Sequence, residues 1–129
     1  MKWFVMSIRN KYADFHGRAG RSEFWQCMFF FSLFASIAIV FDHSLGLEFH
    51  NRIHAGLITT IYGLLLITPI LALCVRRLHD TSHSGSILFL ALLPLIGTIW
   101  LIDLFLSESD EFDNRYGTNP KESHLTMKQ

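Results

Sequence analysis

Charged side chains gather just outside two apolar blocks of this sequence, and their types suit the binding of anions. An arginine guanidinium donates paired hydrogen bonds to a phosphate or a carboxylate, so such a cluster could hold a lipid head group. The same bonds could instead go to acidic residues of the chain, as salt bridges and interfacial anchors. The residues of this candidate lipid- or partner-binding cluster are Arg18, Arg21, Glu23, Arg76, Arg77, His79 and Asp80.

Two histidine pairs have the four-residue spacing that can bind zinc on a helix: His79 with His83, and His50 with His54. Neither pair has a clear third ligand nearby, and the serines and glycine after His83 disfavour a helix there. The two cysteines lie far apart, without the CxxC spacing of redox or zinc sites. The sequence therefore predicts no metal site and no cofactor.

Catalysis would need an activated nucleophile or a placed acid and base. His79 and Asp80 could form such a pair, but adjacent side chains often point apart, and no GxSxG, HExxH or P-loop motif occurs. We expect no catalytic residues and no enzyme activity. Asp103 is a separate candidate, because an ionisable residue inside a membrane span suits proton or cation passage. Its place near the end of an apolar block equally allows it to reach the interface.

Three long apolar blocks must position these residues. Half of the 129 residues are apolar and only 17% are charged, and the apolar ones concentrate in residues 24–41, 55–75 and 86–106. Each block is close to the roughly 20 residues that a helix needs to cross a 30 Å hydrocarbon layer. The sequence predicts an all-α membrane protein, with three transmembrane helices in a single domain over residues 1–129.

The third block contains an interruption, Pro94 to Gly97. This segment could be a kink within one span or the tip of a re-entrant hairpin with two short arms. A re-entrant tip must find protein or water for its backbone polar groups, and a small chain offers little protein. We therefore expect a kinked span.

The segment before the first block has apolar residues at helical spacing: Phe4, Ile8, Tyr12 and Phe15. This pattern predicts an amphipathic helix over residues 2–15 that lies at the membrane interface and contacts lipid head groups. A solvated, flexible segment is the alternative. Residues 107–129 form a polar tail that begins with an acidic run.

Orientation follows from the positive charges that flank the spans. Seven Lys and Arg residues fall on the N-terminal side of the predicted membrane and four on the other. The N-terminus is therefore predicted to be cytoplasmic and the tail, after three spans, to lie outside. The formal net charge is zero and no nucleic-acid-binding motif is present, so we expect no nucleic acid partner.

Three short motifs occur in a specific order around the apolar blocks: GRAGRSEFW at 17–25, RRLHD at 76–80 and NRYGTNP at 114–120. With these motifs the chain resembles the bacterial YhaH/YhaI-type inner-membrane family, a domain of unknown function (805), over roughly residues 10–120. The resemblance implies a multi-pass protein of the bacterial inner membrane and brings no established activity. Departures from the family pattern include Gly20 for a common serine and Thr118 for a frequent proline. The third motif adds the candidate residues Asn114, Arg115, Tyr116 and Gly117.

These features favour a structural or interaction protein that binds membrane lipids or a membrane-protein partner. The alternative is a subunit of an oligomeric transporter or channel, for which Asp103 is the sequence signal. Three helices are too few to enclose most pathways, so that alternative requires a homo-oligomer or a larger complex.

Overall fold

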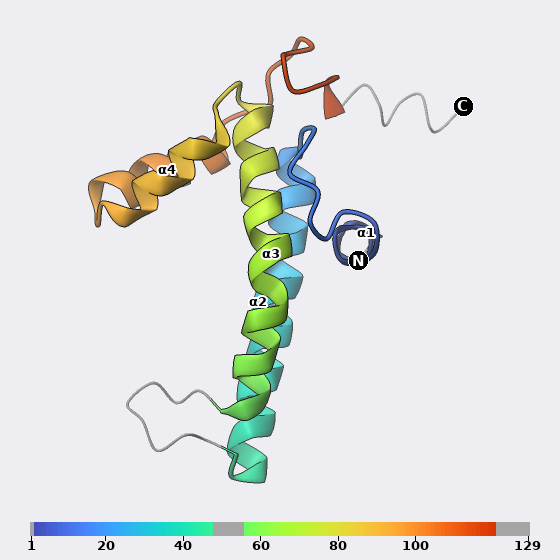
Figure 1. Ribbon diagram of the computed structural model, residues 1–129, viewed down its shortest axis with the longest axis vertical. Helices are drawn as coiled ribbons and strands as arrows, with labels where there is room; N and C mark the ends of the chain where they lie inside the picture. The colour runs from blue at the N-terminus through green and yellow to red at the C-terminus, as the bar shows by residue number, and fades with distance from the viewer. Residues whose placement is uncertain (1, 48–55, 121–129) are drawn as a thin grey trace.

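The computed structural model describes residues 2–47 and 56–120, and within these ranges it contains helices and no strand (Figure 1). The elements are helix α1 (Lys2–Arg9), helix α2 (Arg21–Leu45), helix α3 (Leu57–Asp80), the 3₁₀ helix η1 (Gly85–Leu92) and helix α4 (Ile96–Leu106). The predicted all-α fold class is therefore confirmed.

Helices α2 and α3 lie side by side, run in opposite directions and form a long stem (Figure 1). Apolar residues of both helices make its core, and the Tyr62 hydroxyl donates a hydrogen bond of 2.8 Å to the Phe31 carbonyl. Both helices are long and apolar enough to cross a membrane. At 1.5 Å per residue each is roughly 36 Å long, which exceeds the hydrocarbon layer of about 30 Å.

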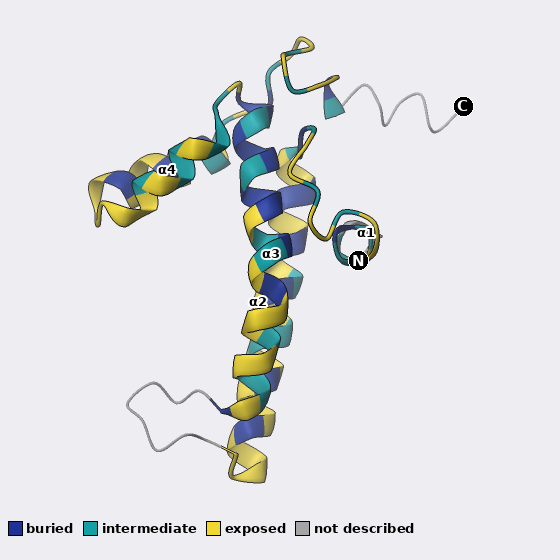
Figure 2. Cartoon of the chain, in the orientation of Figure 1, coloured by how far each residue is buried: buried dark blue, intermediate teal, exposed yellow. Residues whose placement is uncertain are grey.

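The outer faces of the stem are apolar and exposed over most of its length (Figure 2). This pattern suits a lipid environment, because apolar side chains can face the acyl chains while the helical backbone satisfies its own polar groups. The predicted spans 24–41 and 55–75 fall on α2 and α3, although residue 55 lies outside the described ranges. The first two spans are thus found as helices of the expected type.

At the far end of the stem, Asp42 of α2 caps the first turn of α3. Its carboxylate accepts hydrogen bonds from the backbone N–H groups of Ile58 (2.9 Å) and Thr59 (2.8 Å) and from the Thr59 hydroxyl (2.7 Å). Gly56, the residue before α3, has no side chain that could cap the helix itself. A Cβ atom at Gly56 would lie 2.2 Å from the Asp42 Cγ, so only glycine fits beside this cap.

Helix α1 is shorter than the predicted interfacial helix over residues 2–15, because it ends at Arg9. It lies across the stem, where the Phe4 ring contacts three phenylalanine rings of α2 at centroid distances of 5.2 to 5.6 Å (Figure 1). After Arg9 the chain turns, and the Tyr12 hydroxyl reaches the Leu65 carbonyl of α3. The predicted helix is therefore wrong over residues 10–15, where the chain turns and bonds to α3 instead.

The third predicted span is not confirmed, and its predicted form, one kinked helix over 86–106, is wrong. Helices η1 and α4 run back to back as a hairpin, hereafter the hairpin, which leaves the stem sideways (Figure 1). Its two helices pack so closely that a Cβ atom at Gly97 would lie 1.8 Å from the Leu90 carbonyl oxygen. With 8 and 11 residues, each of these helices is roughly 16 Å long, about half of a bilayer core.

The tip of the hairpin satisfies several of its own backbone groups, which the argument for a kink did not take into account. Leu95 has φ of 68° and ψ of −72°, and the Ile96 N–H donates to the Pro94 carbonyl, which together define a γ-turn. The N–H groups of Leu93 and Gly97 also bond to carbonyls within the hairpin.

The hairpin returns the chain to the end of the stem from which it left. Residues 107–120 therefore lie beside residues 16–20, and the Arg18 guanidinium bonds to the carbonyls of Phe112 and Asp110. The prediction that the tail and the N-terminal segment lie on opposite sides is wrong for residues 107–120, because these residues bond to Arg18 of that segment.

Candidate functional site: a buried polar network at one end of the stem

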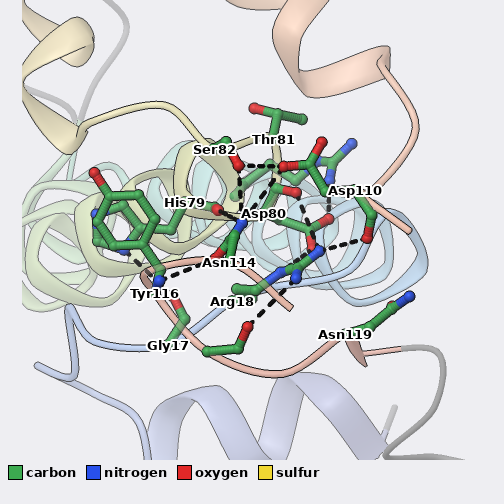
Figure 3. A network of polar contacts seen from close by, with 12 residues as sticks. Gly17, Arg18, His79, Asp80, Thr81, Ser82, Asp110, Asn114, Tyr116 and Asn119 are labelled. Atoms are coloured by element: carbon green, nitrogen blue, oxygen red, sulfur yellow. Dashed lines mark hydrogen bonds and ion pairs between the residues drawn. The ribbon is translucent and has the colours of Figure 1, made fainter. Parts of the chain in front are cut away.

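The three sequence motifs converge at the end of α3 that carries Asp80. The 17–25 motif leads into α2, the 76–80 motif ends α3, and the 114–117 turn packs against His79 (Figure 3). We call the assembly the polar network and define it by its members: Arg18, Glu23, Arg76, Arg77, His79, Asp80 and the residues that bond to them. The structure thus brings together the cluster that the sequence proposed.

Asp80 is the centre of the polar network. Its carboxylate is fully buried and receives the Arg18 Nε on one oxygen at 3.0 Å and the Arg77 Nη1 on the other. Both arginine side chains are also buried, at 1% and 0% exposure. A carboxylate shared by two buried guanidinium groups compensates their desolvation, and removing it would leave two uncompensated charges.

The remaining donors of Arg18 hold the tail. Its Nη1 donates to the Phe112 carbonyl at 2.8 Å, and its Nη2 donates to the Asp110 carbonyl at 2.8 Å and the Asp80 carbonyl at 3.3 Å (Figure 3). Arg18 therefore ties the N-terminal motif, the end of α3 and the tail into one unit.

Arg77 and Arg21 hold the base of the hairpin. The Nε and Nη2 atoms of Arg77 both lie 3.3 Å from the Phe105 carbonyl oxygen, and Nη2 also donates to the Ser107 carbonyl. Arg21 donates to the Leu106 carbonyl at 3.0 Å. These carbonyls end α4 and lack helical donors of their own, so the two cations cap the helix and favour its negative dipole end.

Arg76 and Glu23 form the second ion pair of the polar network. Their Nη1 and Oε1 atoms lie 3.0 Å apart, and Lys11 approaches the same Glu23 oxygen at 3.9 Å. The Arg76 carbonyl accepts the Ala19 N–H at 3.0 Å, which fixes the approach of the 17–25 motif. In the described part of the chain, the buried Nε and Nη2 atoms of Arg76 have no hydrogen-bond partner.

The C-terminal turn motif closes over His79. Asn114 and Gly117 exchange backbone hydrogen bonds of 3.1 and 3.0 Å, and this turn lays the Tyr116 ring flat on the His79 ring at 3.9 Å (Figure 3). The Asn114 side chain donates to the His79 carbonyl at 2.9 Å. The Arg115 guanidinium lies over the Tyr116 ring, 4.8 Å from the ring centroid. Tyr116 therefore covers His79 from solvent.

Apart from the Arg76 Nε and Nη2 atoms, the buried arginine side chains of the polar network bond to groups of the chain itself. Arg18, Arg76 and Arg77 are buried, whereas Arg21 and Arg115 are exposed. A pocket of about 260 Å³ opens beside Arg21, but Glu23 and Glu108 also line it. The salt-bridge alternative raised by the sequence thus describes the buried arginines, and an anionic ligand would have to meet the exposed ones.

The other sequence candidates lie outside the polar network. Asp103 is exposed on α4, one turn before the end of the hairpin. Among residues 2–47 and 56–120, no three His, Cys, Asp or Glu side chains are grouped as a metal site would need. His50 and His54 lie outside those ranges.

Two residues that sequence reasoning missed organise the fold. Asp42 follows directly on the first apolar block, and its capping role had one available signal: an acid at the end of a span, followed by a glycine before the next span. Tyr12 was expected at the membrane interface, and its bond to Leu65 of α3 had no local signal.

Comparison with known proteins gives a consistent result. The family model described as a protein of unknown function (DUF805) matches residues 12–118. The chain is 36% identical over 121 residues to inner membrane protein YhaI of Escherichia coli K12, covering 94% of this chain and 97% of that protein. It is 35% identical over 121 residues to inner membrane protein YhaH of the same strain, covering 94% and 98%. No solved structure matches the chain. This membrane protein therefore belongs to the DUF805 family of inner membrane proteins, whose function is unknown.

Proposed function

We propose that this protein is a structural module of the bacterial inner membrane that presents its hairpin to membrane lipids or to a partner membrane protein. The observation that carries the proposal is the contrast between the two parts of the hairpin. Its base is fixed by Arg77 and Arg21, while its tip exposes large apolar side chains, with Leu92 and Ile96 both 77% exposed. An apolar surface of this kind marks a lipid or protein contact.

In this proposal the polar network serves the hairpin. Buried Arg77 and the neighbouring, exposed Arg21 bond to the backbone carbonyls at the end of α4, so their role is to set the direction in which the hairpin leaves the stem. Lipid head groups meet the exposed Arg21 and Arg115, and acyl chains meet the hairpin. No catalytic step is assigned to any of these residues.

The proposal also places the polar network on the cytoplasmic side. Residues 107–120 share that side with residues 16–20, so Arg115 joins the seven Lys and Arg residues already counted there. An excess of positive charge favours the cytoplasmic face of a membrane. In this proposal the chain crosses the membrane twice, once through α2 and once through α3.

The position of Trp100 on α4 tests the lipid contact directly, because its side chain is 56% exposed on the hairpin. In a chain with Trp3→Phe and Trp25→Phe, only Trp100 fluoresces. We expect lipids brominated on their acyl chains to quench it and aqueous iodide to leave it unaffected. A matched chain that keeps Trp25 instead, at the start of α2, should respond to shallower bromine positions. Quenching of Trp100 by iodide alone would refute an apolar hairpin in lipid.

The alternative function, a subunit of an oligomeric transporter or channel, rests on Asp103. Its exposed carboxylate stands on an otherwise apolar helix, where a charge is costly unless it reaches water or a partner. A two-helix stem cannot enclose a pathway alone, so this alternative requires several copies. Native mass spectrometry of the protein extracted with its lipids distinguishes the two: a defined oligomer with Asp103-dependent flux in vesicles favours the alternative.

A further inference from the structure

Helix α1 and the hairpin, hereafter the two arms, both contact the stem in the same half of its length. In α1, the Ser7 hydroxyl lies 3.3 Å from the Cys27 sulfur, and Phe4 packs on Phe31. Phe4 also packs on Phe34, and these α2 residues lie within about three helical turns, roughly 15 Å, of the point where its apolar segment begins at Phe24. Half of a hydrocarbon core is about 15 Å thick, so α1 lies at the depth of one leaflet.

The hairpin starts at the same end. Leu101 and Leu104 of α4 pack on Leu78, in the last turn of α3, and a Cβ atom at Gly85 would meet the Val75 side chain at 2.8 Å. Both arms lie across the stem rather than along it (Figure 1). The hairpin and α1 therefore enter the same leaflet, the one next to the polar network.

The other half of the stem is slender. In the described ranges, the N-terminal segment reaches as far as Phe34 of α2 and Leu65 of α3, near the middle of the stem; beyond these contacts the two helices pack on each other and meet at the Asp42 cap. Large side chains point outward there, with Val40 at 63% and Leu64 at 65% exposure. One leaflet thus contains two helices and the other contains two helices and both arms.

The arms occupy a substantial area of their leaflet. Treated as rods about 10 Å wide, α1, η1 and α4 together cover on the order of 400 Å² when they lie in the membrane plane. Exposed apolar residues surround the hairpin, so it displaces acyl chains rather than floating at the surface (Figure 2). Insertion of apolar helices into a single leaflet makes membrane binding sensitive to curvature.

We infer that this protein is a one-sided wedge that prefers membranes curved so that the leaflet beside the polar network is convex. Its partner is the acyl layer of that leaflet. The inference rests on the proposed lipid contact of the hairpin, and it adds a preference for shape that lipid contact alone does not require.

The test uses the full chain in vesicles of mixed diameter. Thr118→Cys adds an exposed thiol on the tail, whereas Cys27 and Cys74 are buried, so a fluorophore can be attached beside the polar network. An impermeant quencher then separates molecules with this label outside from those with it inside. We expect outward-labelled molecules to be enriched severalfold per lipid in the smallest vesicles, and inward-labelled ones to be depleted. Equal density at all diameters in both orientations would overturn the wedge.

A tip variant shows whether the hairpin causes the preference. Leu92→Lys with Ile96→Lys should withdraw the tip from the acyl layer and remove most of the size dependence, because both side chains are exposed and support no core packing. Leu92→Met with Ile96→Leu keeps the tip apolar and should preserve it. If the lysine variant fails to fold, Leu92→Ala with Ile96→Ala should give a smaller but measurable loss. Size dependence that is unchanged in the alanine variant would contradict the inference.

The outcome also separates the wedge from the proposed function. Quenching of Trp100 by brominated acyl chains together with uniform vesicle density would retain lipid contact and refute the wedge. Absence of both results would refute the two together.

Discussion

The Tyr12 hydroxyl donates its hydrogen bond to the carbonyl of Leu65 in the middle of α3. This is the carbonyl that Pro69 leaves without a helical donor, because proline has no N–H group to bond four residues back. A residue of the N-terminal segment thus completes the backbone of a helix that is long and apolar enough to cross a membrane. The contact explains how α3 continues through a buried proline, and it attaches the segment after α1 to the stem.

The first prediction concerns this bond. Tyr12→Phe should lower the free energy of unfolding by about 1 kcal/mol, a typical value for one hydrogen bond. In a Pro69→Ala background the restored N–H can satisfy the Leu65 carbonyl, so the same change should cost clearly less. Unfolding in detergent measures both steps of this double-mutant cycle. Equal costs in the two backgrounds would show that Tyr12 does not serve the carbonyl left by Pro69.

The second prediction concerns Asp80. Asp80→Asn removes the charge that two buried arginines share, and we expect a loss of about 3–5 kcal/mol in unfolding free energy. Glu111→Gln, which neutralises an exposed acid of the tail, is the matched control and should stay within about 0.5 kcal/mol of the parent. Equal effects of the two changes would mean that the polar network does not stabilise the fold.

The third prediction concerns the cap at the far end of the stem. Asp42→Ala removes the acceptors of the Ile58 and Thr59 N–H groups in the first turn of α3 and should cost about 1–2 kcal/mol. Asp42→Asn keeps one acceptor oxygen and should cost less. Gly56→Ala should be at least as harmful as Asp42→Ala, because its new methyl group occupies the site of the Asp42 carboxylate. A neutral Gly56→Ala would contradict the described geometry of the cap.

The two long helices could be predicted because their signal is local and strong. The blocks that became α2 and α3 are apolar over the length of a span, and charged residues mark one end of each. The hairpin could not be distinguished from a third span by composition, since both need a continuous apolar block. Its reversal depends on a positive φ at Leu95. A leucine in the sequence, unlike a glycine, gives no indication that the backbone adopts a positive φ there.

The convergence of the charged motifs and the pairing of arginines with Glu23 and Asp80 could be predicted, but the backbone partners of the arginines could not. Arg18, Arg77 and Arg21 bond largely to backbone carbonyls, and a carbonyl carries no mark in the sequence that identifies it as an acceptor. The prediction of which side the tail lies on was wrong for a related reason. It depended on the number of spans, so one error in the third block moved residues 107–120 to the opposite face.

The central claim is that the third apolar block turns back, and thiol labelling at two positions tests it most directly. Ser44→Cys lies at the far end of the stem and Thr118→Cys lies in the tail beside the polar network, and both positions are exposed. With an impermeant maleimide applied to intact and then permeabilised cells, the structure predicts that the two thiols label from opposite sides of the membrane. Labelling of both from the same side would mean that residues 86–106 cross the membrane, and it would contradict the hairpin.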